Sequence, residues 1–70
     1  MKERTFTAVI NKEDDLYVAE CPELGTVSQG RSIEEAPANL KEATELYMEE
    51  FPSPEVAHPL LTTFEAAVNV

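Results

Sequence analysis

The sequence has one cysteine, few basic residues and no long hydrophobic run. Because Cys21 is its single cysteine, no disulfide can form within the chain. Five Lys and Arg residues stand against 14 Asp and Glu residues, and the net charge of -9 repels nucleic-acid phosphates and anionic lipids. No segment has the apolar length of a signal peptide or a membrane span. These absences predict a cytoplasmic protein that binds neither nucleic acid nor membrane directly.

The length of the chain limits what it can build. With 70 residues, 43% of them hydrophobic, it can form one small core, and we expect a single domain over residues 1–70. Domains of this size are usually stabilised by disulfides, metal or oligomerisation. The sequence offers no disulfide and no cluster of metal ligands, so oligomerisation remains. We therefore expect a homodimer or a higher homo-oligomer.

A hairpin is predicted at the start of the chain. Residues 5–11 alternate between apolar and mixed positions, and residues 16–21 have strand character as well. The polar residues 12–15 between them predict a four-residue loop. With that loop, the predicted pairs are Ile10 with Tyr17, Ala8 with Ala19, and Phe6 with Cys21. One face of the hairpin is thus apolar, whereas the other mixes polar and apolar side chains.

The middle of the chain predicts a short strand and one amphipathic helix. Pro22 ends the second strand, and residues 26–29 form a short third one. Ser32 and Glu35 have the spacing of a capping box at a helix start. The expected apolar stripe of the helix is Ile33, Ala36, Leu40, Ala43, Tyr47 and Phe51. For Pro37, either the first helical turn is distorted or the helix begins at the proline itself, and we favour the first.

A fourth strand is predicted at residues 60–70, where strand alternation returns. A right-handed helical crossover from the third strand places it parallel to the first. The predicted fold is therefore α+β, with β-β-β-α-β order and a four-stranded mixed sheet in order 3-2-1-4 under one helix. The sheet residues expected beneath the helix are Phe6, Ala8, Ile10, Tyr17, Ala19, Cys21, Phe64, Ala66 and Val68.

One helix can cover only one face of such a sheet, so the opposite face stays open. Apolar residues on that face favour coverage by another polypeptide. The predicted partner-binding or oligomer-binding residues are Thr7, Val9, Leu16, Val18 and Glu20. The two edge strands also offer unpaired backbone groups. The alternative is that an antiparallel sheet tolerates a few exposed apolar side chains without any function.

The sequence offers no constellation of catalytic residues. Its acids lie in the hairpin loop and on the outer helix face, where solvation explains them. It contains no phosphate-binding glycine loop, no paired metal-binding motif and no serine with a plausible base. Cys21 is expected to be buried, and His58, the single histidine, is expected in a linker. We therefore predict a protein that is not an enzyme, with no catalytic, cofactor-binding or metal-binding residues.

Three segments carry a resemblance to a known family. Residues 17–24 read YVAECPEL, residues 27–30 read VSQG and residues 32–36 read SIEEA, followed by Asn39 and by Glu42 with Ala43. As a set they resemble the HicB family of antitoxin-like proteins. The resemblance implies a truncated ribonuclease-H-like fold without its catalytic acids. It also implies inhibition of a small basic HicA toxin, an mRNA interferase, whose active site the antitoxin covers.

The sequence departs from the family pattern in three ways. The loop after residues 21–24 lacks the usual Pro-Gly pair, and Pro37 replaces a helix-friendly residue. Many family members continue into a C-terminal DNA-binding domain, whereas this sequence stops at Val70, so we do not expect direct operator binding. The leading hypothesis is an antitoxin-like inhibitor of a small basic toxin. The alternative is a solitary, self-associating structural or regulatory module with no toxin partner.

Overall fold

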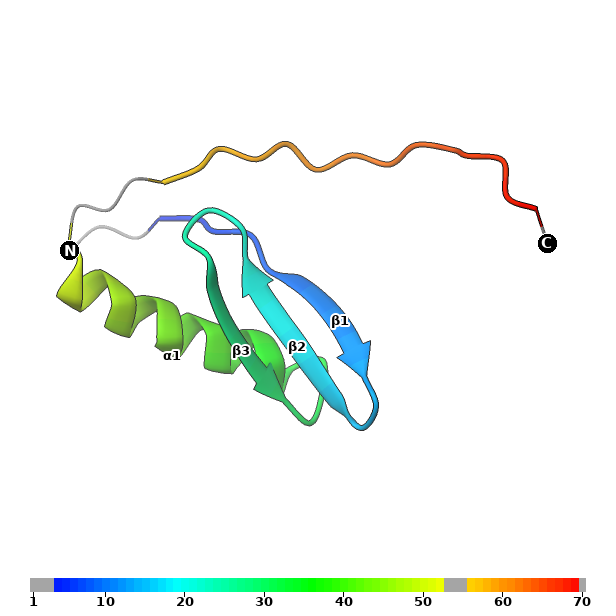
Figure 1. The fold of residues 1–70 in the computed structure, drawn as a ribbon. Coiled ribbons are helices and arrows are strands. Elements are labelled where there is room, and N and C mark those ends of the chain that lie inside the picture. Colours follow the sequence, from blue (N-terminus) through cyan, green and yellow to red (C-terminus); the bar gives the residue numbers. More distant parts are fainter. Residues whose placement is uncertain (1–3, 53–55, 70) are drawn as a thin grey trace.

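A computed structural model describes residues 4–52 and 56–69. Its elements are β1 (Val9–Glu13), β2 (Leu16–Cys21), β3 (Thr26–Gly30) and α1 (Glu35–Glu50). The strands form an antiparallel sheet in the order β1-β2-β3, and α1 packs on one face of it (Figure 1). This confirms an α+β fold with three strands followed by one helix. Among the described residues, no helix is long and apolar enough to cross a membrane.

The hairpin between β1 and β2 is tighter than predicted. Its loop has two residues, Asp14 and Asp15, because the ladder continues to the pair Glu13 and Leu16. Asp14 has a φ of 55°, a left-handed conformation that aspartate tolerates better than most residues. Two-residue loops match the twist of antiparallel strands, which explains why the longer loop is not used. The prediction of a four-residue loop at 12–15 is therefore wrong.

The shorter loop moves every predicted pair by two residues. Ile10 lies opposite Ala19 rather than Tyr17, and Tyr17 lies opposite Lys12. Side chains alternate between the faces with a period of two, so this shift leaves each residue on its predicted face. The regular strand also starts later, at Val9 instead of residue 5. The division of the hairpin into two faces thus survives the error in its register.

The start of α1 lies directly against the end of β3. A Cβ atom added to Gly30 would lie 2.6 Å from the backbone nitrogen of Ala36, closer than a real contact allows. Glu35 N–H donates to Ser32 Oγ over 3.0 Å, while the Glu35 carboxylate accepts a bond from the N–H of Arg31 over 3.1 Å. The capping box is thus present, with its return bond one residue earlier than in the standard form.

Pro37 lies in the first turn of α1, two residues after the helix begins at Glu35. A proline at this place removes an N–H that has no partner within the helix in any case. The favoured alternative, in which the Ser32 and Glu35 pairing persists ahead of the proline, agrees with this arrangement.

The small core lies between α1 and the sheet. Its fully buried side chains are Ala19, Cys21, Ala36 and Leu40, with Phe6, Ile10, Tyr17 and Leu24 packed around them. Thr44 is also buried, and its hydroxyl shares a hydrogen bond of 2.9 Å with that of Thr26 on β3. The ends of the predicted stripe are not covered, since Ile33 is 55% exposed and Phe51 is 51% exposed. The helix therefore uses a stripe spaced by four residues at Ala36, Leu40 and Thr44.

The predicted fourth strand is not formed within residues 56–69, and Val70 lies outside the described residues. Beyond Ala57 these residues run as an extended segment that is separate from the sheet and α1 (Figure 1). Phe64 is 87% exposed and Val68 is 73% exposed, so neither belongs to the core, and Ala66 and Ala8 are exposed as well. The observed sheet has the order β1-β2-β3 rather than 3-2-1-4. Alternation gave this segment the pattern of a strand, but no strand edge among the described residues pairs with it.

Candidate binding face

The face of the sheet away from α1 is the candidate binding surface, and we call it the open face. The pairs that share this face are Val9 with Glu20, Asn11 with Val18, and Glu13 with Leu16. The other face carries Ala19 and Cys21, which pack against the helix. On β3 the open face continues through Val27 and Gln29, which lie opposite Glu20 and Val18. Figure 1 shows α1 on the opposite side of the sheet.

Four of the five predicted site residues come together on the open face. Val9, Leu16 and Val18 are each half-buried among their strand neighbours, and Glu20 is exposed beside them. Sequence analysis missed Val27, which lies opposite Glu20 and is 55% exposed. Its position in the strand at residues 26–29 was the available signal. The centre of the open face is thus an apolar patch that crosses all three strands.

Thr7, the fifth predicted residue, has a different environment. It precedes β1, and its N–H donates to both carboxylate oxygens of Glu23, at 3.0 and 3.1 Å. Its hydroxyl also donates to Glu23 over 2.6 Å. Thr7 therefore joins the N-terminal segment to the turn between β2 and β3, and its hydroxyl is already engaged within the chain.

Glu23 is the strongest electrostatic feature of the described residues. The hydrogen bonds from the Thr7 hydroxyl and N–H stabilise its ionised form and lower the pKa of its carboxyl group from 4.5 to about 2. Cys21 Sγ lies 3.4 Å from the same carboxylate and adds a weak donor. The backbone carbonyl of Glu23 also accepts a bond of 3.0 Å from the N–H of Ala57. One residue thus holds the N-terminal segment, the turn and the start of the C-terminal segment together.

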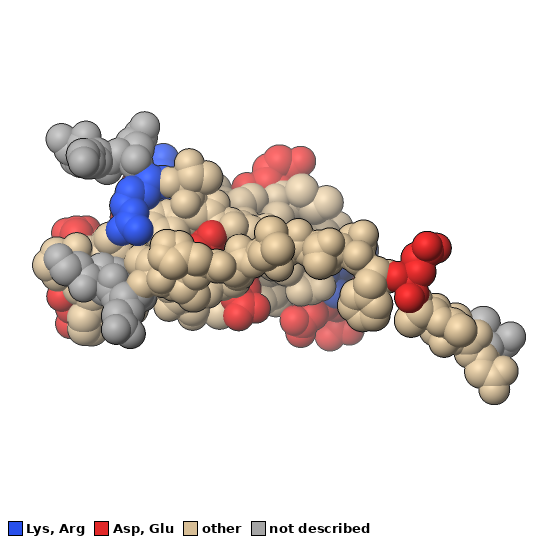
Figure 2. Space-filling model, turned by 90° about the horizontal axis from the view of Figure 1, so that it is seen from above, with Lys and Arg blue, Asp and Glu red and all other residues tan. Residues whose placement is uncertain are grey.

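Acidic side chains lie at the hairpin end of the open face, and one lies within its apolar patch. Glu13 and Glu20 are exposed on the face itself, while Asp14 and Asp15 are exposed at the tip of the hairpin. Lys12 does not neutralise them directly, because it lies on the helix side with its ammonium 5.8 Å from the centre of the Tyr17 ring. Figure 2 shows acidic groups at several separate places on one side of the molecule. The open face therefore combines an apolar centre with an acidic margin at its hairpin end, and Glu20 lies within the centre between Val9 and Val27.

The remaining residues that sequence analysis considered for chemistry have simple positions. Cys21 is 1% exposed, which confirms its predicted burial. His58 is exposed in the extended C-terminal segment. Within residues 4–52 and 56–69, no group of three His, Cys, Asp or Glu side chains is arranged to hold a metal ion.

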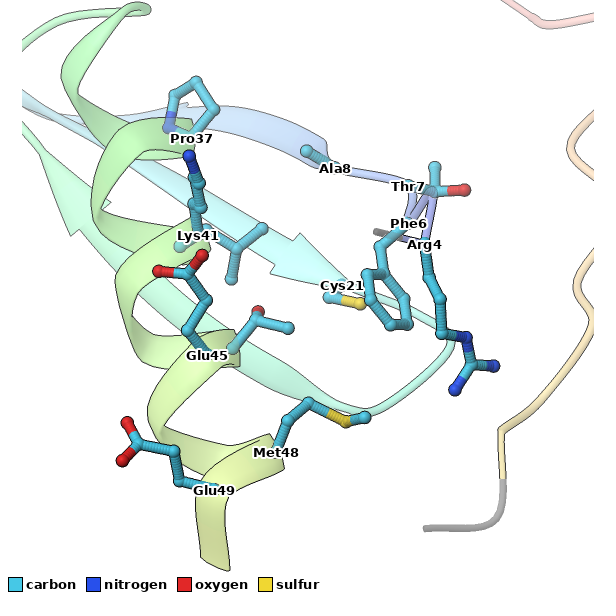
Figure 3. Close-up of a pocket in the computed structure, with 12 residues that line it drawn as sticks. Arg4, Phe6, Thr7, Ala8, Cys21, Pro37, Lys41, Glu45, Met48 and Glu49 are labelled. Carbon is cyan, nitrogen blue, oxygen red and sulfur yellow. The ribbon is translucent and has the colours of Figure 1, made fainter. Parts of the chain in front are cut away.

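A groove that sequence analysis did not predict lies on the helix side of the sheet. It has a volume of about 720 Å³ and runs between residues 4–8 and α1 (Figure 3). Phe6 and Ala8 form one wall, Leu40 and Met48 the other, and Cys21 lies between them. The groove exists because α1 packs mainly on β3 and less on β2, which leaves the β1 side of this face uncovered.

Comparison with known proteins gives one informative match. No family model matches the sequence, and no solved structure does. The chain is 51% identical over 53 residues to a UPF0150 protein of Helicobacter pylori (strain J99 / ATCC 700824), and the match covers 74% of each protein. An identity of that level over most of both proteins implies a shared fold, so this chain belongs to the UPF0150 family.

Proposed function

We propose that this protein is a HicB-like antitoxin that binds a small basic mRNA interferase of the HicA type and blocks its active site. It acts by binding alone and is not an enzyme. The HicB-like segments at residues 17–24, 27–30 and 32–36 support this proposal. The observation that carries it is the open face, with its apolar centre and acidic margin.

The charge of the protein suits a basic partner. A net charge of -9 on 70 residues attracts a basic protein from a distance and speeds its association. The acids at the hairpin end of the open face, Glu13, Asp14 and Asp15, are exposed and can meet basic side chains at the rim of an interface. Exposed pairs of this kind contribute mainly to association rate and specificity. Binding should therefore weaken as the salt concentration rises.

The apolar centre supplies the part of the interface that excludes water. Val9, Leu16 and Val18 form a patch across neighbouring strands, and Val27 extends it on β3. Interfaces obtain most of their affinity from such a central, well-packed group surrounded by a polar rim. A charge placed in this centre should weaken binding far more than one placed elsewhere on the surface.

The direct test uses the gene next to the one that encodes this chain. If that gene encodes a small basic protein, we expect its expression alone to arrest growth and co-expression of this chain to restore it. Calorimetry with the purified pair should show binding, and Val18→Glu should weaken it by roughly tenfold or more. Leu46→Glu is the matched control, because Leu46 is 60% exposed on α1 away from the open face.

Two outcomes would contradict the proposal. One is failure of this chain to restore growth when the basic neighbouring protein arrests it. The other is equal binding by the Val18→Glu and Leu46→Glu variants, which would show that the open face is not the binding surface. Absence of any basic neighbour would favour the second candidate, a solitary self-associating module of the same fold. The observation that favours this candidate is the exposed apolar segment at residues 56–69.

A further inference from the structure

The C-terminal segment presents apolar side chains that nothing in the described chain covers. Leu60 is 89% exposed, Phe64 is 87% exposed and Val68 is 73% exposed. In an extended segment these residues point to the same side, because their spacing is even. Thr62 and Ala66 lie between them on that side. The segment is therefore a strand in pattern, with one apolar face and no paired neighbour among the described residues.

The packed part of the molecule has an edge and a groove that match this segment. Within the described residues, β1 pairs with β2 on one side and with no strand on the other. The groove between residues 4–8 and α1 opens on the helix side of that same edge, and Phe6 and Leu40 line it (Figure 3). A strand added beside β1 would place one row of its side chains over this groove.

We infer that residues 60–69 of one chain add as a strand to the β1 edge of a second copy, with Phe64 and its even-numbered neighbours in the groove. The exchange is reciprocal and gives a two-fold symmetric dimer. Residues 60–69 are long enough to pair along β1 (Val9–Glu13) and to continue beside residues 4–8, which line the groove. Glu65 is the one acidic residue in the segment, so the segment can approach the acidic body of a second copy without strong repulsion.

Within the described residues the segment pairs with no strand of its own chain, so the β1 edge stays available to a second copy. The Ala57 N–H is bonded to the Glu23 carbonyl over 3.0 Å, so the segment leaves the body at the turn between β2 and β3. From there it passes the sheet as a separate extended stretch, and its later part lies beyond the sheet (Figure 1). Pro52 and Pro59 restrict the backbone on either side of this departure. Short, restricted connections of this kind favour exchange between copies over folding back.

This dimer does not depend on the proposed function. The exchanged strand occupies the β1 edge and the groove on the helix side, whereas the open face lies on the other side of the sheet. A dimer built in this way leaves both open faces free for another protein. Failure of one proposal therefore leaves the other intact.

The first test is the mass in solution. Light scattering should give twice the 7.8 kDa of one chain, and Phe64→Asp should raise the dissociation constant of the dimer by roughly 100-fold. The control is Leu61→Asp, because Leu61 is 60% exposed and lies on the opposite side of the extended segment. The helix signal in circular dichroism should persist in both variants. A monomeric native chain, or a dimer that Phe64→Asp leaves unchanged, would overturn the inference.

The second test places the segment on its partner. A spin label is attached to folded Ala66→Cys chains that carry no isotope. These chains are then mixed with ¹⁵N-labelled native chains, and the mixture is unfolded and refolded. Cys21 is 1% exposed and does not react with the label in the folded protein. We expect the amide signals of Phe6 and Ala8 to broaden in the ¹⁵N chains, while that of Val27, on the far edge strand, keeps its width. Broadening that occurs only when label and isotope share one chain would show that the segment folds back, and would overturn the exchange.

Discussion

Two regions of this molecule have apolar residues at every second position but differ in whether those residues are buried. In β2 (Leu16–Cys21) every second residue from Tyr17 to Cys21 is apolar, and Ala19 and Cys21 are fully buried under α1. In residues 60–68 every even-numbered residue except Thr62 is apolar, yet Phe64 and Val68 remain exposed. The difference is the presence of a helix and of neighbouring strands around β2. Alternation thus predicts which face a strand can bury. Whether that face is buried depends on the helices and strands that pack against it.

The comparison extends to the two sides of the sheet. The helix side holds a core of small residues, and α1 approaches so closely that Gly30 has no room for a side chain. The open face holds larger aliphatic residues such as Leu16 and Val18, and they are half-buried by their own neighbours alone. The packed side is covered by α1 except at the groove beside residues 4–8, whereas the open face and most of the C-terminal segment have no cover among the described residues.

The largest expected loss of stability follows the truncation of a core side chain. The same kind of truncation in the C-terminal segment should have almost no effect. Leu40→Ala should lower the free energy of unfolding by about 3 kcal/mol, because Leu40 is 4% exposed and its loss leaves a cavity. Phe64→Ala, measured in the monomer at high dilution, should change it by less than about 0.5 kcal/mol, as is usual for an exposed site. Urea titrations followed by the helix signal measure both. A similar loss for the two variants would mean that the segment packs on its own chain.

A smaller effect is expected where α1 meets β3. Gly30→Ala puts a methyl group against the backbone of Ala36 and should cost about 2 kcal/mol in the free energy of unfolding. Gly25→Ala is the comparison, since Gly25 has a φ of 79° but no atom within 4 Å of the added carbon. Backbone strain alone should cost it about 1 kcal/mol. If Gly25→Ala were the more damaging of the two, close packing of the helix would not be the constraint at Gly30.

Much of the packed region could be predicted from the sequence because local chemistry determines it. Ser32 and Glu35 marked the helix start, and Pro22 marked the end of β2. The faces of the hairpin were also predicted, since they depend only on whether a residue number is odd or even along each strand. The register was not, because a tight turn at Asp14 and a longer loop suit the same residues, and only the turn geometry separates them.

The candidate site could be predicted in part for the same reason. Val9, Leu16, Val18 and Glu20 share the open face as expected from alternation. The bond from Thr7 to Glu23 and the groove beside Phe6 could not be inferred, since both depend on contacts between distant segments. The fourth strand was overpredicted because a sequence shows that a strand can form without showing which edge it meets.

The smallest expected effect concerns Glu23, where the packed region meets the C-terminal segment. Its pKa is lowered from 4.5 to about 2 by the bonds from Thr7, so it binds a proton less readily in the folded state than in the unfolded state. The stabilisation it provides is complete above pH 4.5 and is lost as the pH falls from 4.5 to about 2. The native chain should therefore have a higher free energy of unfolding than Glu23→Gln above pH 4.5, and this difference should shrink as the pH falls to about 2.

Urea titrations from pH 7 to pH 2 measure that difference, and Thr7→Val provides its control. Removing the hydroxyl deletes the shortest bond to the carboxylate, so the pKa of Glu23 should rise toward 4.5 and the effect of Glu23→Gln should shrink. An effect of the same size in the Thr7→Val background would show that Thr7 is not the cause. Protonation of the Glu23 carboxylate should also release Thr7 and so free residues 4–8, which form one wall of the groove. The bond from the Ala57 N–H should remain, because it is made to the backbone carbonyl of Glu23.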